Sequence, residues 1–166
     1  MATLEAFRNK DPGQAWAWFV QGTHRVNGHD FALLVGRDVL GSDRYARLLV
    51  AATLLLVAAG GMVTSTNSGL SVPDWPTSYG YSMFSFPLSK MVGGIFYEHG
   101  HRLIASGVGV LTIGLVIFIW RVDPRAWMKR LSLVGLAAVI LQGVLGGLTV
   151  RFMLPAPISI GHAGLA

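Results

Sequence analysis

The sequence predicts an all-α integral membrane protein, a four-helix transmembrane bundle whose fourth helix is truncated. Of its 166 residues, 52% are hydrophobic and only 13% are charged, whereas a soluble domain carries about 25% charged residues. Several uncharged runs along the chain are close in length to the roughly 20 residues that a helix needs to cross a bilayer. Basic residues gather at the ends of these runs, so the net charge of +5 reflects membrane topology and not nucleic-acid binding. The lipid bilayer is therefore the expected surrounding medium.

The first spanning helix is expected at about 46–66, directly after Arg44 and Arg47. Residues 1–43 form a mixed, charged leader that includes Trp16 and Trp18 and is either interfacial or disordered. Taken alone, the first apolar run could belong to a signal peptide. The further spans downstream favour an uncleaved first helix.

A long loop, 67–91, follows and is rich in Pro, Gly, Ser and aromatic residues. Loops of this length are usually functional or disordered, and the aromatic content favours a functional loop that lies on the membrane and caps a site. The second span is expected at 92–120. Pro124 helps to end it within the short basic loop 121–130.

The third span, 131–150, carries Gly143 and Gly147 on a small-residue face that lets a helix or a flat ligand approach closely. Gln142, a lone polar residue in this span, is expected to bond a neighbouring helix rather than a ligand. A fourth helix starts near 157 and stops at Ala166 after too few turns to span a bilayer. The sequence therefore looks like the front part of a longer protein, with 44–166 as a transmembrane half.

Charge placement predicts the topology. Cytoplasmic loops of membrane proteins carry an excess of Lys and Arg, so the basic loop 121–130 and the arginines before the first span belong inside. The loop 67–91 and the turn 151–157 are then outside. His101 and His162 each follow an external segment at a similar distance, and so are expected at matching depth near the outer membrane face.

A polar cluster opens the second span, where Glu98, His101 and Arg102 share one helical face and His99 points elsewhere. Ionisable residues inside membrane helices are functional by default. Two histidines from different helices of a bundle can ligate a haem iron from both sides. This predicts His101 and His162 as iron ligands, with Arg102 beside a haem propionate. The competing interpretation is a simple Glu98–Arg102 ion pair, with each histidine bonded to a neighbouring helix.

The same residues support two other kinds of metal site less well than they support a haem site. A zinc or di-metal site has too few ligands, and the absence of cysteine excludes thiolate ligands and disulfides within the chain. Matched histidines beside an intramembrane acid favour haem.

Three stretches carry a resemblance to a known family. They are 60–76, which includes Val72-Pro73-Asp74-Trp75-Pro76, then 91–102, which ends in an E-x-x-H-R element, and 141–150. In this order and spacing they resemble the amino-terminal half of the haem A synthase family of cytochrome oxidase biogenesis. The match covers about 44–166, and the E-x-x-H-R element is its most specific part.

The resemblance implies an eight-helix protein built from two similar four-helix halves. Such proteins are oxidoreductases that convert the ring D methyl group of haem O to a formyl group, giving haem A for terminal oxidases. It implies that His101 and His162 hold the substrate haem and that Glu98 is the catalytic acid. The family's second half carries a haem b and is missing here, so the fragment alone is expected to be inactive.

The resemblance also implies a location and partners. The expected location is the inner (plasma) membrane, multi-pass, with haem O synthase, cytochrome oxidase assembly proteins and further copies of the chain as partners. Some family members carry a cysteine pair in the first external loop, where Val72 and Ser78 stand in this sequence. Any thiol-dependent step is therefore absent or replaced.

Oxidising a methyl group needs an electron sink, a route for protons and a polar group near the reacting carbon. Glu98 could take up protons or stabilise a positive charge that develops on the macrocycle, and the sequence leaves both roles open. Two other classes of protein also remain open. One is a four-helix b-type cytochrome that only transfers electrons, and the other is a non-catalytic membrane assembly factor whose histidines brace the bundle.

Overall fold

The computed structural model describes residues 25–26 and 29–166, with side chains from residue 44 onward. The chain divides into two compact units, Met1–Arg44 and Tyr45–Ala166. In the first unit, strands β1 (Arg25–Val26) and β2 (His29–Asp30) pair antiparallel ahead of helix α3. The predicted interfacial or disordered character of the leader falls largely on 1–24, outside the described residues.

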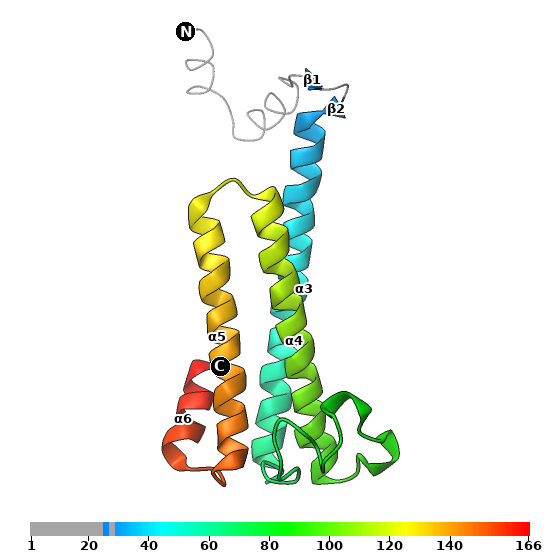
Figure 1. Cartoon of the computed structure of the whole chain (residues 1–166), viewed down its shortest axis with the longest axis vertical. Helices are drawn as coiled ribbons and strands as arrows, with labels where there is room; N and C mark the ends of the chain where they lie inside the picture. The colour runs from blue at the N-terminus through cyan, green and yellow to red at the C-terminus, as the bar shows by residue number, and fades with distance from the viewer. Residues whose placement is uncertain (1–24, 27–28) are drawn as a thin grey trace. The chain divides into compact units, whose positions relative to one another are not determined.

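Helices make up the rest of the described secondary structure, and the predicted all-α membrane fold is confirmed (Figure 1). Three of them contain stretches that are long and apolar enough to cross a membrane. The helices are α3 (Phe31–Ser65), α4 (Gly94–Val122), α5 (Ala126–Arg151) and α6 (Ala156–Leu165). Two short 3-10 turns, Met83–Ser85 and Leu88–Lys90, lie in the loop between α3 and α4.

Two helices begin earlier than the hydropathy pattern predicts. Helix α3 begins at Phe31, ahead of the expected 46, and α5 begins at Ala126, ahead of the expected 131. Hydropathy marks where a helix enters the apolar layer, whereas Lys, Arg and Leu all favour helix outside it. Pro124 disfavours helical backbone at Asp123, where α4 has ended, and α5 starts two residues past the proline.

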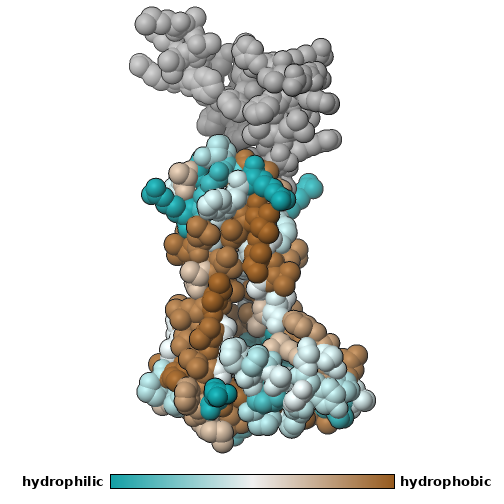
Figure 2. Space-filling model, viewed as in Figure 1, coloured by the Kyte–Doolittle hydropathy of each residue, from teal (hydrophilic) through white to brown (hydrophobic). Residues whose placement is uncertain are grey.

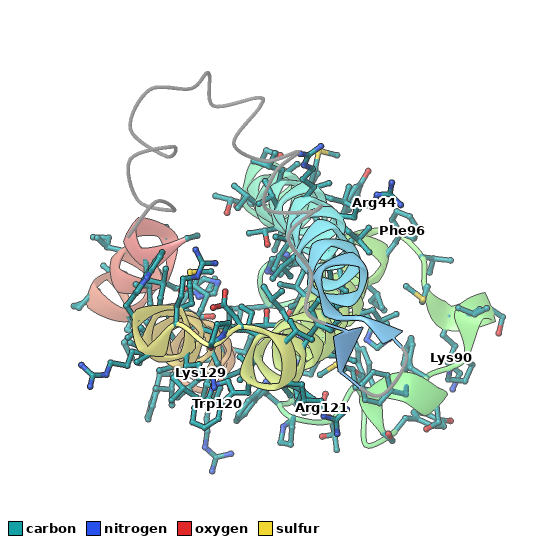
Figure 3. The ribbon with its side chains drawn as sticks, turned by 90° about the horizontal axis from the view of Figure 1, so that it is seen from above. Arg44, Lys90, Phe96, Trp120, Arg121 and Lys129 are labelled. Atoms are coloured by element: carbon teal, nitrogen blue, oxygen red, sulfur yellow. The ribbon has the colours of Figure 1, made fainter. Side chains whose placement is uncertain are left out.

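Within the second unit, α3, α4 and α5 stand side by side and alternate in direction (Figure 1). Helix α4 packs on α5, and the shorter α6 packs on the end of α5 nearest the 151–155 turn. As a result α4 and α6 both start at the end of the bundle that holds the 66–93 loop. Figure 3, seen along the helices, shows the four following one another around an arc.

The outer surface of the second unit is apolar in its middle, between hydrophilic ends (Figure 2). Large apolar side chains on all three long helices are exposed, among them Leu54, Val110, Val134 and Ile140. Such a surface suits lipid and not water. Together with the three spans, this makes the chain a multi-pass membrane protein.

The helix ends remote from the 66–93 loop carry a cluster of basic residues. Figure 3 labels Arg121 and Lys129 there, next to Trp120. The Lys129 Nζ lies 5.8 Å from the Trp120 ring centroid, and the Arg125 guanidinium lies 5.2 Å from the ring of Trp127. Tryptophan and basic side chains together are typical of a membrane–water interface.

Candidate functional site

His101 lies about two turns into α4, which begins at Gly94. Its imidazole is seated on the backbone of α3 at Gly60, where a Cβ atom would come within 3.1 Å of the His101 Cε1. The neighbouring Gly61 faces open space. Gly60 is therefore the position at which α3 admits the imidazole.

His162 occupies a comparable position in α6, nearly two turns past its start at Ala156. Its ring is seated on Gly146 of α5, where a Cβ would lie 3.0 Å from the His162 Cε1. The side-chain amide of Gln142, one turn away on α5, donates from Nε2 to the His162 carbonyl oxygen at 2.8 Å. This confirms the predicted helix–helix hydrogen bond of Gln142 and fixes α6 at the histidine.

The two histidines lie near the same end of the bundle, because α4 and α6 both start at the end that holds the 66–93 loop and each histidine lies about two turns past its helix start. Within the part of the chain that the structure describes, the Nδ1 atoms of both histidines, the Gln142 Oε1 and the Ser159 Oγ are buried and have no hydrogen-bond partner. Because buried polar groups are nearly always bonded, these four atoms mark α4, α5 and α6 as the helices of a candidate ligand site.

A haem fits this donor set. Neutral imidazole nitrogen is a common ligand of haem iron. Because Gly60 and Gly146 have no side chain, both imidazole rings fit against the neighbouring helices without a clash. Gly100, Gly161 and Gly164 also have no heavy atom within 4 Å of an added Cβ, so nothing described there obstructs a flat group.

Glu98 and Arg102 form a buried ion pair, with Nη2 to Oε1 at 2.7 Å and exposures of 4% and 8%. Both partners also bind the 66–93 loop. Arg102 donates from Nη2 to the Val72 carbonyl at 2.8 Å, and Glu98 Oε2 accepts from the Val72 N–H at 2.8 Å. Arg102 Nη1 donates to the carbonyls of Asp74 at 2.8 Å and Thr77 at 3.2 Å.

The structure contains the i,i+4 ion pair of the competing sequence interpretation. The same two side chains also anchor the loop, which the sequence does not indicate. Both terminal nitrogens of Arg102 are engaged, which leaves only its Nε for the predicted propionate contact. Glu98 and Arg102 point to the loop, whereas His101 points to α3, so they do not form a single polar face.

Asp74 organises the loop segment that Arg102 holds. Its carboxylate accepts hydrogen bonds from the Thr77 hydroxyl at 2.5 Å, the Tyr79 N–H at 2.6 Å and the Gly80 N–H at 2.9 Å. Partial desolvation opposes ionisation, but the hydrogen bonds from Gly80, Thr77 and Tyr79 outweigh it and hold the pKa of Asp74 below its usual value.

His99 packs against the loop, which the sequence did not predict. It is 1% exposed, its Nδ1 lies 3.0 Å from the Ser78 Oγ, and its ring centroid lies 4.8 Å from that of Phe86. Phe86 in turn packs against Tyr79 and Tyr81. The aromatic residues of the loop were the feature of the sequence that could have predicted this contact, because large apolar rings need a packing partner on the helices.

The fold defines a class: multi-pass helical membrane proteins in which a loop at one end of the bundle is anchored to a helix by a buried ion pair. A family model described as "Cytochrome oxidase assembly protein" (COX15-CtaA) matches residues 81–166. The chain belongs to this family.

Three similar proteins are each named "Heme A synthase". The one from Symbiobacterium thermophilum is 31% identical over 118 residues, covering 70% of this chain and 37% of that protein. Those from Bacillus licheniformis and Brucella anthropi are 29% and 28% identical, covering 69% and 72% of this chain and 37% and 36% of theirs. The chain thus spans little more than a third of the length of these relatives. No solved structure matches it.

Proposed function

We propose that this chain is the substrate-holding part of a haem A synthase, in which His101 and His162 bind haem O through its iron. The observation that carries the proposal is the pair of glycine-seated imidazoles with orphaned Nδ1 atoms on two different helices. The relatives named "Heme A synthase" support the same substrate.

The reaction converts the methyl group on ring D to a formyl group. With water as the oxygen source, the methyl group gains one oxygen atom and releases four electrons and four protons, so an electron acceptor is required. The described residues provide no such acceptor. When bound, the substrate haem supplies the reacting carbon and the iron that the two imidazoles hold, while a haem b in a second half is the proposed electron carrier.

Glu98 is the proposed catalytic acid, and both of its predicted roles remain part of the proposal. It is paired with Arg102 and accepts a hydrogen bond from Val72 N–H, so both oxygens are occupied and its position is fixed by the helix and the loop together. Arg102 becomes a positioning residue, because it fixes Glu98 and the loop together.

The proposed orientation places the histidine site toward the outer face of the inner (plasma) membrane. It is supported by the basic residues at the opposite end of the helices, which in membrane proteins lie in the cytoplasm. These residues are Arg121, Arg125, Lys129 and Arg130, at the end of α4 and the start of α5. Haem O synthase, other oxidase assembly proteins and a homo-oligomer remain proposed partners.

The test is expression of the complete reading frame in a host that makes haem O and lacks its own haem A synthase, followed by mass spectrometry of extracted haem. The wild type should yield the formyl product. Glu98→Gln should retain bound haem and lose the product, while Asp123→Asn, which removes an acid at the opposite helix ends, should behave as wild type. Bound haem without product would instead indicate a b-type cytochrome, and absence of bound haem would contradict the histidine site.

A further inference from the structure

Trp75 leaves its own loop to contact helix α5. At Gly147 an added Cβ atom would overlap the Cδ2, Cε2 and Cζ2 atoms of the Trp75 indole, so the ring lies directly on the helix backbone. Three other loop aromatics, Tyr79, Tyr81 and Phe86, form ring pairs among themselves and with His99. Among residues whose side chains are described, Trp75 joins none of these ring pairs.

The contact lies level with the histidine site along the bundle axis, on an adjoining face of the helix, because successive helical residues are only about 1.5 Å apart along that axis. Gly147 directly follows Gly146, on which the His162 ring is seated. On the other side, Arg102 directly follows His101 and donates to the carbonyl of Asp74, the residue before Trp75. The loop segment 72–77 therefore crosses from α4 to α5 at the level of the two histidines.

We propose that Trp75 forms an aromatic wall of the histidine site and positions the planar macrocycle that His101 and His162 hold. This inference rests on the proposed function and adds a residue to it. An indole offers a large, flat apolar face to a conjugated ring system, and such pairs gain energy beyond the area that they bury. Trp75 acts by contact with the ligand and takes no part in the chemistry.

The position of Trp75 is set before any ligand binds. Arg102 holds the carbonyls of Val72, Asp74 and Thr77, which flank the tryptophan on both sides. The Asp74 carboxylate ties the same segment to the Tyr79 and Gly80 amides. A side chain fixed in this way binds without an ordering cost, which is the advantage of a preorganised site.

The test is titration of haem into the detergent-purified protein, followed by absorbance and by tryptophan fluorescence. Trp75→Ala should weaken haem binding about tenfold, with a smaller effect for Trp75→Phe. Trp127→Phe, at the opposite end of α5, is the matched control and should bind as wild type. Energy transfer to haem falls steeply with distance, so Trp75→Phe should remove the most strongly quenched emission and Trp127→Phe a weakly quenched part.

A reciprocal pair of variants tests the same contact from the helix. Gly147→Ala leaves no room for the indole and should reproduce the weakened binding of Trp75→Ala, whereas Gly135→Ala faces open space on the same helix and should not. Wild-type affinity and quenching in both Trp75→Ala and Gly147→Ala would overturn the proposed wall while leaving the histidine site intact. Failure of the wild type itself to bind haem would overturn the proposed function and this inference with it.

Discussion

Arg102 donates a hydrogen bond from its Nη1 to the main-chain carbonyl of Asp74, 2.8 Å away in the loop between α3 and α4. The residue before it, His101, points instead to Gly60 of α3. One turn of α4 therefore carries both a proposed iron ligand and the anchor of the loop that covers it. Displacing the loop and displacing the ligand should be separable experimentally, because different side chains do the two jobs.

Removing the Arg102 guanidinium should detach the loop. Arg102→Gln leaves the buried Glu98 carboxylate without its ion partner, and breaking a buried pair in this way costs about 3–5 kcal/mol. We expect a lower unfolding temperature in detergent and faster proteolysis within 66–93. Arg125→Gln breaks an exposed pair with Asp123 and should change neither measurement. Equal stability of the two variants would contradict the anchoring role.

The glycine seats should tolerate no side chain. Gly60→Ala brings a Cβ within 3.1 Å of the His101 ring, and overpacking of this kind costs about 1–3 kcal/mol, so haem affinity should fall about fivefold to a hundredfold. Gly61→Ala meets no atom within 4 Å and is the control. The dissociation constant from a haem titration distinguishes the two. If Gly60→Ala bound as tightly as Gly61→Ala, the His101 ring would not need that seat.

Gln142 should act through His162. Gln142→Leu removes the 2.8 Å hydrogen bond to the His162 carbonyl, and the loss of one such bond costs about 0.5–1.5 kcal/mol, or a two- to tenfold weaker haem complex. The absorption maximum should stay that of the wild type, because the ligand set is unchanged. A changed spectrum would mean that Gln142 itself contacts the haem.

The Asp74 turn should fail in acid. Because the folded-state pKa of Asp74 lies below its ordinary 3.8, its ionisation stabilises the loop fully above that value, and the stabilisation is lost as pH falls through the lower folded-state pKa. Proteolysis of the loop by an acid-active protease should therefore accelerate below about pH 4. Asp74→Asn should start from a less protected loop and lose this pH step. A step of equal size in Asp74→Asn would assign it to another group.

Sequence reasoning predicted the bundle because hydropathy and basic clusters depend only on composition along the chain. It placed His101 and His162 near the same end of the bundle through the alternation of loops, which agrees with α4 and α6 both starting at the loop end. It could not predict the anchoring of Val72 and Asp74 by Glu98 and Arg102, because the path of an irregular loop follows from tertiary contacts and not from periodicity. The burial of His99 against Phe86 was hidden for the same reason.

Part of the candidate site could be predicted from the spacing of glycine residues. The small-residue face at 143–147 predicted a close approach to α5, and the structure assigns Gly146 to His162 and Gly147 to Trp75. Spacing could not say which partner meets which glycine, since that depends on the rotation of α5 against α6 and on the route of the loop.

The proposed function requires that His101 and His162 ligate one iron from opposite sides. The most direct test is the optical and electron paramagnetic resonance spectrum of ferric haem bound to the wild type, His101→Ala and His162→Ala. We predict a six-coordinate low-spin spectrum for the wild type, its loss in each variant, and its recovery on addition of free imidazole. A low-spin bis-imidazole spectrum that persists in either variant would contradict the claim.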